Sequence, residues 1–212
     1  MNQVLNKKIA SLWVQLFSNN FIRNKFILTV LILLSTLIFL PYYFSIIEKR
    51  NGIVLNDIVL NSLPAKDVSI LIFSIIWSLS ILMFIKAVQN PRLFVIFVTS
   101  FTFLTVSRII TIYFVPLNPP IGLIELKDPL SNFFYGNTFI TKDLFYSGHT
   151  ATMFLMYLCF KNKILKAIAL VATLMVGFLV LLQHVHYTLD VLAAPFSVYI
   201  IFRVVKCWLK GI

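Results

Sequence analysis

Six apolar segments, separated by short polar breaks, dominate this sequence. They cover residues 26–47, 68–88, 93–115, 147–160, 164–182 and 189–208. A helix needs about 20 apolar residues to cross a bilayer, so the fourth segment is short and the others are long enough. Hydrophobic residues make up 60% of the chain and charged residues 12%, which is about half the charged fraction of a soluble domain. The pattern predicts an all-α, polytopic membrane protein with six transmembrane helices in a single domain, residues 26–212.

The rest of the composition excludes several classes of protein. A chain this apolar is not a disordered segment, a coiled coil or a disulfide-rich scaffold. Its net charge of +11 would suit a nucleic-acid-binding protein. In a membrane protein, however, basic residues gather in the cytoplasmic loops, so we expect no nucleic-acid partner. Cys159 and Cys207 lack the spacing of a metal or redox motif.

Residues 1–25 precede the first apolar segment and follow a different pattern. Apolar residues recur there at helical spacing between polar neighbours: Ile9, Leu12, Trp13, Leu16 and Phe17. This pattern predicts an amphipathic helix that lies in the membrane interface. The first apolar segment is too long for the core of a signal peptide, so we expect it to be a true span.

The lysines and arginines predict how the chain is oriented. Twelve of them lie at the chain ends and in the loops on one side of the six spans, and five lie in the loops on the other side. Cytoplasmic loops carry the excess, so both termini are expected in the cytoplasm. All three histidines and all seven acidic residues map to the opposite side or its edge. That separation points to a functional site on the non-cytoplasmic side.

Arg108 lies inside the third span. An arginine in a span is costly, and it marks either a functional site or a buried ion pair. It follows Leu93 by 15 residues, which places it roughly 22 Å along the helix and in its outer half. Its role is left open: it could be a functional residue, a structurally paired cation, or a cation that snorkels to the membrane surface.

A polar motif leads directly into the fourth span: Asp143-Leu-Phe-Tyr-Ser147-Gly148-His149-Thr150. Ser147 or Thr150 could cap the helix that follows. The free N–H groups of its first turn would favour an anion such as phosphate, and His149 would lie beside that anion. A plain helix cap is the simpler alternative.

A second motif opens the sixth span: His184-Val-His186-Tyr-Thr-Leu-Asp190. His186 and Asp190 are four residues apart and share one helix face. A carboxylate bonded to one imidazole nitrogen leaves the other nitrogen as a base or nucleophile. The histidine pair could also bind a metal, but there is no HExxH sequence and no carboxylate cluster, so we expect no metal and no other cofactor. The role of His184 is left open.

The predicted topology places these groups at one level of the membrane: Arg108, Asp143, His149, His186 and Asp190. A cation, a helix N-terminus and two histidines, one with a carboxylate partner, can transfer a phosphoryl group through a histidine. We expect the two histidines and Asp190 to lie at water-facing helix ends.

These motifs resemble those of a known family. Residues 143–150 (DLFYSGHT) and 186–190 (HYTLD) closely resemble the two catalytic motifs of the sphingomyelin synthases. These enzymes are a branch of the type 2 phosphatidic acid phosphatase (PAP2) superfamily. Residues 108–113, followed by Leu117-Asn-Pro119, resemble the third-span motif of that branch. The resemblance runs from Arg108 to the C-terminus and weakly includes Leu63-Pro64.

The resemblance implies a PAP2-like six-helix bundle with its site on the exoplasmic side. His186 would attack the lipid phosphorus, and Asp190 would orient that histidine. His149 would act as the acid for the leaving group and the base for the acceptor. The residues expected to bind or frame the phosphate are Arg108, Asp143, Ser147 and Gly148.

The sequence also departs from the patterns of the superfamily. The synthases usually have Cys-Gly-Asp before Ser-Gly-His, whereas Thr141-Lys142-Asp143 keeps only the acid. The Lys-x6-Arg-Pro motif of the phosphatases is absent, and Val180 stands where they have an arginine. The resemblance therefore favours the synthase-like branch.

We expect an integral-membrane phosphotransferase that moves a phosphorylated head group from a phospholipid to a lipid hydroxyl, ceramide-like or diacylglycerol-like, through a phosphohistidine. The alternative is a lipid phosphate phosphatase that uses water as the acceptor. A third interpretation, from another class, is a non-enzymatic membrane protein or transporter that binds lipid. The short N-terminal segment suits a bacterial homologue in the cytoplasmic (inner) membrane. The oligomeric state is left open.

Overall fold

The chain folds into long helices joined by extended connections. The computed structural model describes residues 2–127 and 140–210. In chain order the helices are α1 (Asn2–Ser18), α2 (Asn20–Ile47), α3 (Ile58–Asn61), α4 (Ser69–Gln89), α5 (Pro91–Phe114), α7 (Gly148–Cys159), α8 (Lys163–Leu182) and α9 (Thr188–Trp208). The described residues form no β-strand, and an isolated bridge pairs Ile53 with Leu117.

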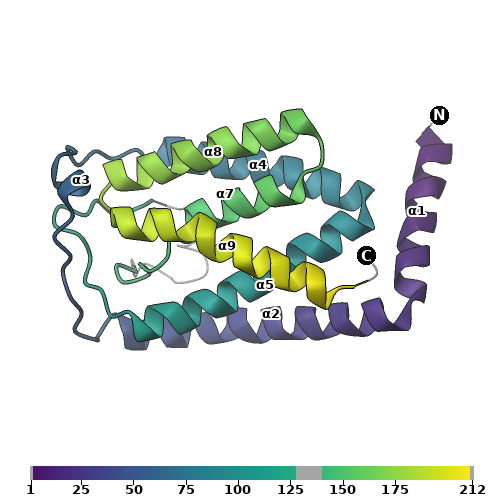
Figure 1. The fold of residues 1–212 in the computed structure, drawn as a ribbon, viewed down its shortest axis with the longest axis horizontal. Coiled ribbons are helices and arrows are strands. Elements are labelled where there is room, and N and C mark those ends of the chain that lie inside the picture. Colours follow the sequence, from purple (N-terminus) through teal and green to yellow (C-terminus); the bar gives the residue numbers. More distant parts are fainter. Residues whose placement is uncertain (1, 128–139, 211–212) are drawn as a thin grey trace.

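The long helices alternate in direction along a bundle (Figure 1). α2 packs on α5 and α4 packs on α8, while α7 lies between them against α8 and α9. The end of the bundle that carries α3 and the connections after α2, α5 and α8 is called the site end below. The opposite end, which carries α1 and the end of α9, is called the terminal end. The beginning and the end of the chain therefore lie at the same end of the bundle.

All six expected segments are helical, with bounds that differ by a few residues from expectation. The largest difference is in α2, which begins at Asn20 rather than at residue 26, because the side chain of Asn19 caps the helix there. The helix therefore includes Arg23 and Lys25. Lys25 Nζ donates to the carbonyl of Trp208 and lies 3.8 Å from the ring centre of Phe21. A cation in this position stabilises the C-terminal end of α9.

Asparagines in the polar breaks start three of the helices at the terminal end. The side chain of Asn19 accepts hydrogen bonds from the first turn of α2, and Asn90 accepts one from Leu93 N of α5. Asn162 does the same for two N–H groups of α8. Each cap satisfies donors that the helix itself leaves unpaired, so the polar breaks determine where these helices begin.

α7 is short because the chain before it enters the bundle without forming a helix. Its 12 residues span roughly 18 Å, against the ~30 Å hydrocarbon core of a bilayer. Figure 1 shows α7 beginning well inside the site end of the bundle. Residues 140–147 reach that depth as irregular chain, and Leu144, Tyr146 and Ser147 are buried. Such backbone is tolerated at membrane depth only where protein buries it or where it lines a cavity.

Five of the described helices are long and apolar enough to cross a membrane: α2, α4, α5, α8 and α9. The multi-pass architecture follows from them. The sixth span, which would include α7, and the cytoplasmic placement of the termini stay predictions.

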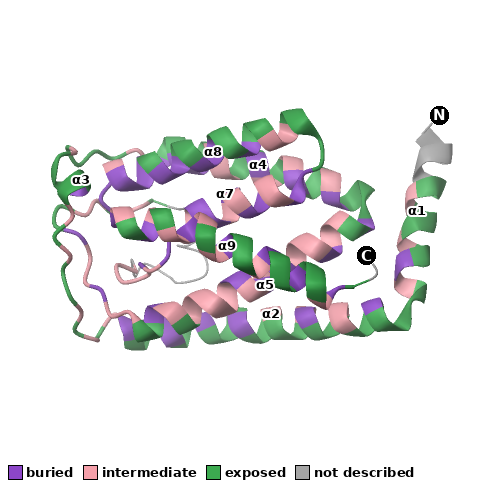
Figure 2. Ribbon diagram, viewed as in Figure 1, coloured by how far each residue is buried: buried purple, intermediate pink, exposed green. Residues whose placement is uncertain are grey.

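Many residues on the outward faces of the bundle are exposed (Figure 2), and large apolar residues are common among the exposed ones. Ile38 on α2 is 81% exposed and Ile70 on α4 is 82% exposed. Soluble monomers rarely expose contiguous apolar patches of more than a few hundred Å². The surface therefore suits contact with lipid chains, as in an integral membrane protein.

α1 crosses the terminal end of the bundle, transverse to α2 (Figure 1). Trp13 Nε1 donates to the carbonyl of Val88 at 3.0 Å, and the Trp13 ring packs on Phe17 and Phe94. Leu16 is buried on the same side. The helix expected within residues 1–25 is thus formed and docked, and its interfacial placement stays a prediction.

Candidate active site

The expected site residues come from three stretches of the chain that meet inside the site end. In order they are Arg108 on α5, Asp143 and Ser147 in the connection to α7, Gly148 and His149 in the first turn of α7, His186 in the turn before α9, and Asp190 in the first turn of α9. Contacts described below link each of them to at least one other. The structure therefore brings together groups that lie up to 82 positions apart in the sequence, from Arg108 to Asp190.

Arg108 is held by the chain segment that precedes α7. Its Nη2 lies 2.6 Å from Asp143 Oδ1, and its Nε donates to the carbonyl of Tyr146 at 2.9 Å. The side chains of Arg108 and Asp143 are 15% and 33% exposed, so the ion pair is shielded but still reached from outside. The ion pair considered for Arg108 from the sequence is therefore present. Its third nitrogen, Nη1, remains available for a ligand.

Gly148 lies directly against the guanidinium of Arg108. A Cβ atom at position 148 would lie 2.7 Å from Arg108 Cζ and closer still to Nη1, which real Cβ atoms do not do. Only glycine lets the cation approach the first turn of α7, where backbone N–H groups lack partners within the helix. A cation and a helix N-terminus therefore face one space, an arrangement that favours phosphate oxygens.

The two histidines of the motifs are neighbours. The ring centroids of His149 and His186 are 6.4 Å apart, and the ring of Phe73 on α4 packs edge-on against His149 at 6.0 Å. This separation is suitable for a phosphate group that contacts both imidazoles. Proton transfer and nucleophilic attack at one phosphorus require such an arrangement.

His186 and Asp190 form a buried pair at the start of α9. His186 Nδ1 lies 3.4 Å from Asp190 Oδ2, and the side chains are 5% and 0% exposed. Nδ1 makes no hydrogen bond elsewhere in the described chain, and the same holds for Asp190 Oδ1. Because Nδ1 is the nitrogen that faces the carboxylate, Nε2 is the atom left for chemistry.

The expectation that these positions face water is wrong for His186 and Asp190, which are both buried. Outer connections cover the start of α9, and Asp190 Oδ2 also accepts a hydrogen bond from Tyr187 N at 3.0 Å. Asp190 therefore caps α9 as well as facing His186. A substitution at Asp190 will affect folding in addition to chemistry.

Ser147 caps α7, as the motif suggests. Its Oγ accepts a hydrogen bond from Thr150 N at 3.4 Å, and its own N–H donates to the carbonyl of Asp190 at 3.1 Å. Ser147 is fully buried, so it joins α7 to α9 and does not line the cavity described next.

A cavity of about 650 Å³ extends from the site into the bundle between α2, α4, α5 and α7. Its walls are mostly apolar and reach Ala87 and Phe94 near the terminal end. Its polar lining at the site end consists of Arg108, Asp143, Gly148 and His149. The cavity thus joins a polar end, which includes a cation and an imidazole, to a long apolar space.

Sequence reasoning missed Asp57, which fastens the first outer connection to α9. Its carboxylate accepts hydrogen bonds from Thr188 N at 2.6 Å and Thr188 Oγ1 at 2.9 Å, and it caps α3 through Leu60 N at 3.0 Å. Burial raises the pKa of Asp57, but the hydrogen bonds from Leu60 and Thr188 outweigh burial and lower it. The aspartate before a short helix resembles any N-cap, and no local signal reveals its second partner.

Glu48 was also missed. Its carboxylate accepts hydrogen bonds from Thr141 N at 2.7 Å, Thr141 Oγ1 at 2.8 Å and Lys142 N at 2.8 Å. Lys142 Nζ in turn donates to the carbonyl of Glu48 at 2.9 Å. The end of α2 therefore holds the backbone immediately before Asp143, the partner of Arg108.

His184, whose role the sequence left open, links two outer connections. Its Nδ1 lies 2.9 Å from the carbonyl oxygen of Ile121, and its Nε2 lies 3.1 Å from that of Leu63. Both ring nitrogens thus face backbone carbonyls. The geometry gives this histidine a structural role in the turn between α8 and α9.

Two comparisons with known proteins bear on the site. No curated protein matches the chain. The family model described as PAP2 superfamily C-terminal matches residues 142–208. The match includes α7, α8 and α9. It also includes six of the seven expected site residues, all except Arg108: Asp143, Ser147, Gly148, His149, His186 and Asp190. A PAP2 superfamily C-terminal domain is therefore found at residues 142–208, a type of domain that suggests a phosphatase or phosphotransferase acting on lipids.

Proposed function

We propose that this chain is an integral-membrane phosphotransferase of the sphingomyelin synthase-like type. It would move a phosphorylated head group from a phospholipid donor to the hydroxyl of a ceramide-like or diacylglycerol-like acceptor. The observation that carries the proposal is the apolar cavity of about 650 Å³ that ends at Arg108 and His149, with His186 behind them. The polar end suits a phosphate and the apolar walls suit a lipid chain.

The first half-reaction makes a phosphohistidine. His186 Nε2 attacks the phosphorus with its lone pair, and the bond from phosphorus to the glycerol oxygen breaks. His149, in its protonated form, gives its proton to that oxygen, and diacylglycerol leaves. Asp190 balances the positive charge that develops on His186, because its carboxylate faces Nδ1 at 3.4 Å.

The second half-reaction returns both histidines to their starting states. His149, now neutral, takes the proton of the acceptor hydroxyl, and the acceptor oxygen attacks the phosphorus. The bond between phosphorus and His186 Nε2 breaks, and the imidazole regains its lone pair. Arg108 stabilises the charge on the phosphate oxygens in both steps, and Asp143 holds Arg108 in place.

Reconstitution of the full chain in liposomes tests the proposal. The donor is phosphatidylcholine labelled in its head group, supplied with no acceptor, with ceramide or with diacylglycerol, and the products are separated by chromatography. Transfer predicts that the label appears on the added acceptor lipid. Label found only in a water-soluble product would instead establish the phosphatase alternative, and no reaction with any of several head groups would contradict both.

The cellular placement is part of the same proposal. The excess of basic residues at the terminal end supports a cytoplasmic location for that end and an exoplasmic site, as in a bacterial inner membrane. Cysteine substitution at Lys142 and Lys163, followed by an impermeant thiol reagent, checks it. Labelling of position 163 from outside the cell would reverse the orientation.

A further inference from the structure

A second large cavity lies at the terminal end of the bundle, far from the candidate active site. It has a volume of about 680 Å³ and lies between the ends of α4, α7 and α9 and the beginnings of α5 and α8. Five of the residues that line it are basic: Lys86, Arg92, Lys161, Lys166 and Lys206. No lining residue is acidic. This cavity is called the basic pocket below.

The basic residues of the pocket lack carboxylate counterions among residues 2–127 and 140–210. None of the five forms an ion pair with a carboxylate in the described part of the chain. The sequence explains why, since residues 1–47, 68–124, 144–189 and 191–212 contain no aspartate or glutamate. An anion from outside the protein is therefore the natural partner for these charges.

Topology alone does not account for this arrangement. Basic residues near span ends orient a membrane protein wherever on that side they lie, and acidic residues have little influence. Orientation thus requires neither that five cations line one cavity nor that carboxylates be absent from it. Lys166 Nζ lies 4.8 Å from the ring centre of Tyr157, and Lys206 Nζ lies 5.5 Å from that of Phe202. Each of these two ammonium groups thus has an aromatic ring as a neighbour, and one of the rings, Phe202, lines the pocket.

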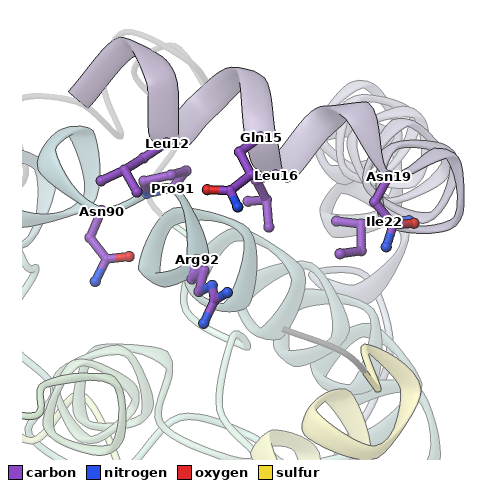
Figure 3. Close-up of a pocket in the computed structure, with 8 residues that line it drawn as sticks. All are labelled: Leu12, Gln15, Leu16, Asn19, Ile22, Asn90, Pro91 and Arg92. Atoms are coloured by element: carbon purple, nitrogen blue, oxygen red, sulfur yellow. The ribbon is translucent and has the colours of Figure 1, made fainter. Parts of the chain in front are cut away.

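Arg92 connects the basic pocket to a smaller hollow under α1. That hollow has a volume of about 240 Å³ and shares Asn90 and Arg92 with the basic pocket. Figure 3 shows it between α1 and the start of α5, with the side chain of Arg92 pointing away from α1. The pocket therefore adjoins the helix that the sequence places in the membrane interface.

We propose that the basic pocket binds the phosphate group of an anionic ligand. The shared chemistry is a phosphate held by lysine and arginine, and its source is either a phospholipid head group or a soluble polyphosphate. The lining favours the lipid, because Leu93, Ile96 and Phe202 give the pocket an apolar floor at the ends of the spans. Basic pockets between transmembrane helices on the cytoplasmic side are suited to anionic head groups. This site is separate from the proposed catalysis and does not depend on it.

Native mass spectrometry of the full chain, released from a neutral detergent, tests the proposal. The probes are phosphatidylglycerol, phosphatidylcholine with the same acyl chains, and ATP. The pocket variant combines Lys86→Gln, Lys161→Gln and Lys206→Gln. The matched control combines Arg23→Gln, Lys163→Gln and Lys210→Gln, which remove three charges from the same end of the bundle but from outside the pocket lining.

The proposal predicts that the wild type retains phosphatidylglycerol more tightly than phosphatidylcholine. Each basic residue near a membrane surface contributes roughly a fivefold factor in binding anionic lipid, so the pocket variant should bind phosphatidylglycerol about 100-fold more weakly. The control variant should bind within about threefold of the wild type. Arg92→Gln alone, a milder change that is less demanding for folding, should weaken binding roughly fivefold.

The probes separate the two sources of phosphate. Loss of phosphatidylglycerol binding in the pocket variant alone, with ATP bound weakly, supports the lipid. Loss of ATP binding in the pocket variant alone supports a soluble polyphosphate in the same site. Equal losses in both triple variants, or no preference of the wild type for either anionic probe, would overturn the proposal, because the charges would then act only as a diffuse basic surface.

Discussion

At the site end of the bundle, charged side chains are tied to one another and to backbone carbonyls. Arg108 pairs with Asp143, Lys127 pairs with Asp67, and Arg50 donates to the carbonyl of Tyr113. At the terminal end, by contrast, the five cations of the basic pocket have no carboxylate partner in the described chain. Charged side chains named at the site end thus have partners in the protein, whereas the cations of the basic pocket have no carboxylate partner in the described chain.

The difference reflects what each end is suited to do. A site that stabilises charge during a reaction needs its donors fixed before the substrate arrives, and the network at the site end fixes them. A site that only binds an anion can leave its cations on flexible side chains and use their mutual repulsion to favour the ligand. Five experiments, in order of decreasing effect, show how far this contrast holds.

Removal of the proposed nucleophile should have the largest effect. His186→Ala should lower both transfer and hydrolysis by about 10⁴-fold or more, because the covalent route is lost. Lys163→Gln, a change at the terminal end, should leave the rate unchanged. The measurement is the initial rate with labelled phospholipid, together with capture of the labelled protein. A phosphoenzyme that accumulates in His186→Ala would show that another residue is the nucleophile.

The second effect separates the two histidines. His149→Ala should lower transfer from the natural donor by about 10²- to 10⁴-fold, as is usual for loss of a general acid and base. On a nitrophenyl phosphodiester, whose leaving group needs no proton, it should retain more activity than His186→Ala. Rates of both variants on both substrates provide the check. Equal losses on the activated ester would mean that the roles are assigned wrongly.

Gly148→Ala should have an intermediate effect. The added methyl group would displace the guanidinium of Arg108, and a misplacement of about 1 Å can cost roughly 10²-fold in rate. Asn162→Ala at the terminal end removes a helix cap and should lower stability but not the rate. Steady-state kinetics and thermal unfolding of both variants in detergent distinguish the outcomes. A fully active Gly148→Ala would indicate that the position of Arg108 is unimportant.

Asp57→Asn should reduce the transfer rate by about tenfold, because α9 loses part of its anchor. The lowered pKa of Asp57 means that its ionised form stabilises the fold above the unfolded value of about 4, and that this contribution is lost as the pH falls through the folded pKa. The unfolding temperature should therefore fall less steeply in Asp57→Asn than in the wild type as the pH is lowered from 7 to about 3.

Asp67 provides the control for Asp57. Hydrogen bonds from the side chains of Ser69 and Lys127 lower the pKa of Asp67 to about 2, but it does not contact α9. Asp67→Asn should thus leave the transfer rate unchanged. If Asp57→Asn and Asp67→Asn changed the rate equally, the anchor between Asp57 and α9 would not be what positions the site.

The smallest expected effect is that of a chelator. The proposed chemistry uses a histidine nucleophile and cationic side chains, so excess EDTA should leave transfer unchanged. Initial rates before and after metal removal test this expectation. Activity that disappears with EDTA and returns with zinc or magnesium would require metal ligands at this site. The site end would then depend on a bound cation and not on its own paired side chains.

The helices could be predicted because their signals are local. Runs of apolar residues and polar breaks such as Asn90 and Asn162 determine where the helices begin, and all six expected segments are helical. The shortness of α7 followed from the same pattern, which predicted residues 147–160 where the structure has Gly148–Cys159, but the irregular chain before it did not. Whether buried chain is helical or irregular depends on partners from elsewhere in the bundle.

The site could be predicted in part, because Arg108, His149 and His186 are unusual in apolar surroundings and stand out by type. Their supports do not stand out. Glu48 lies 93 residues from Thr141, and Asp57 lies 131 residues from Thr188. The burial of Asp190 and the convergence of five cations on the basic pocket also arise only when distant helices pack together.

The bonds that Asp57 and Ser147 make to α9 have a consequence for how the protein is made. Thr188 and Asp190 leave the ribosome after every other part of the candidate site. Asp57 and Ser147 therefore cannot form their hydrogen bonds to Thr188 and Asp190 until α9 is inserted. A chain whose synthesis stalls within α8 has Arg108 and His149 but neither His186 nor its carboxylate. Under the proposed mechanism, unfinished molecules would therefore be inert toward the lipids around them, because they would lack both the nucleophile and its carboxylate partner.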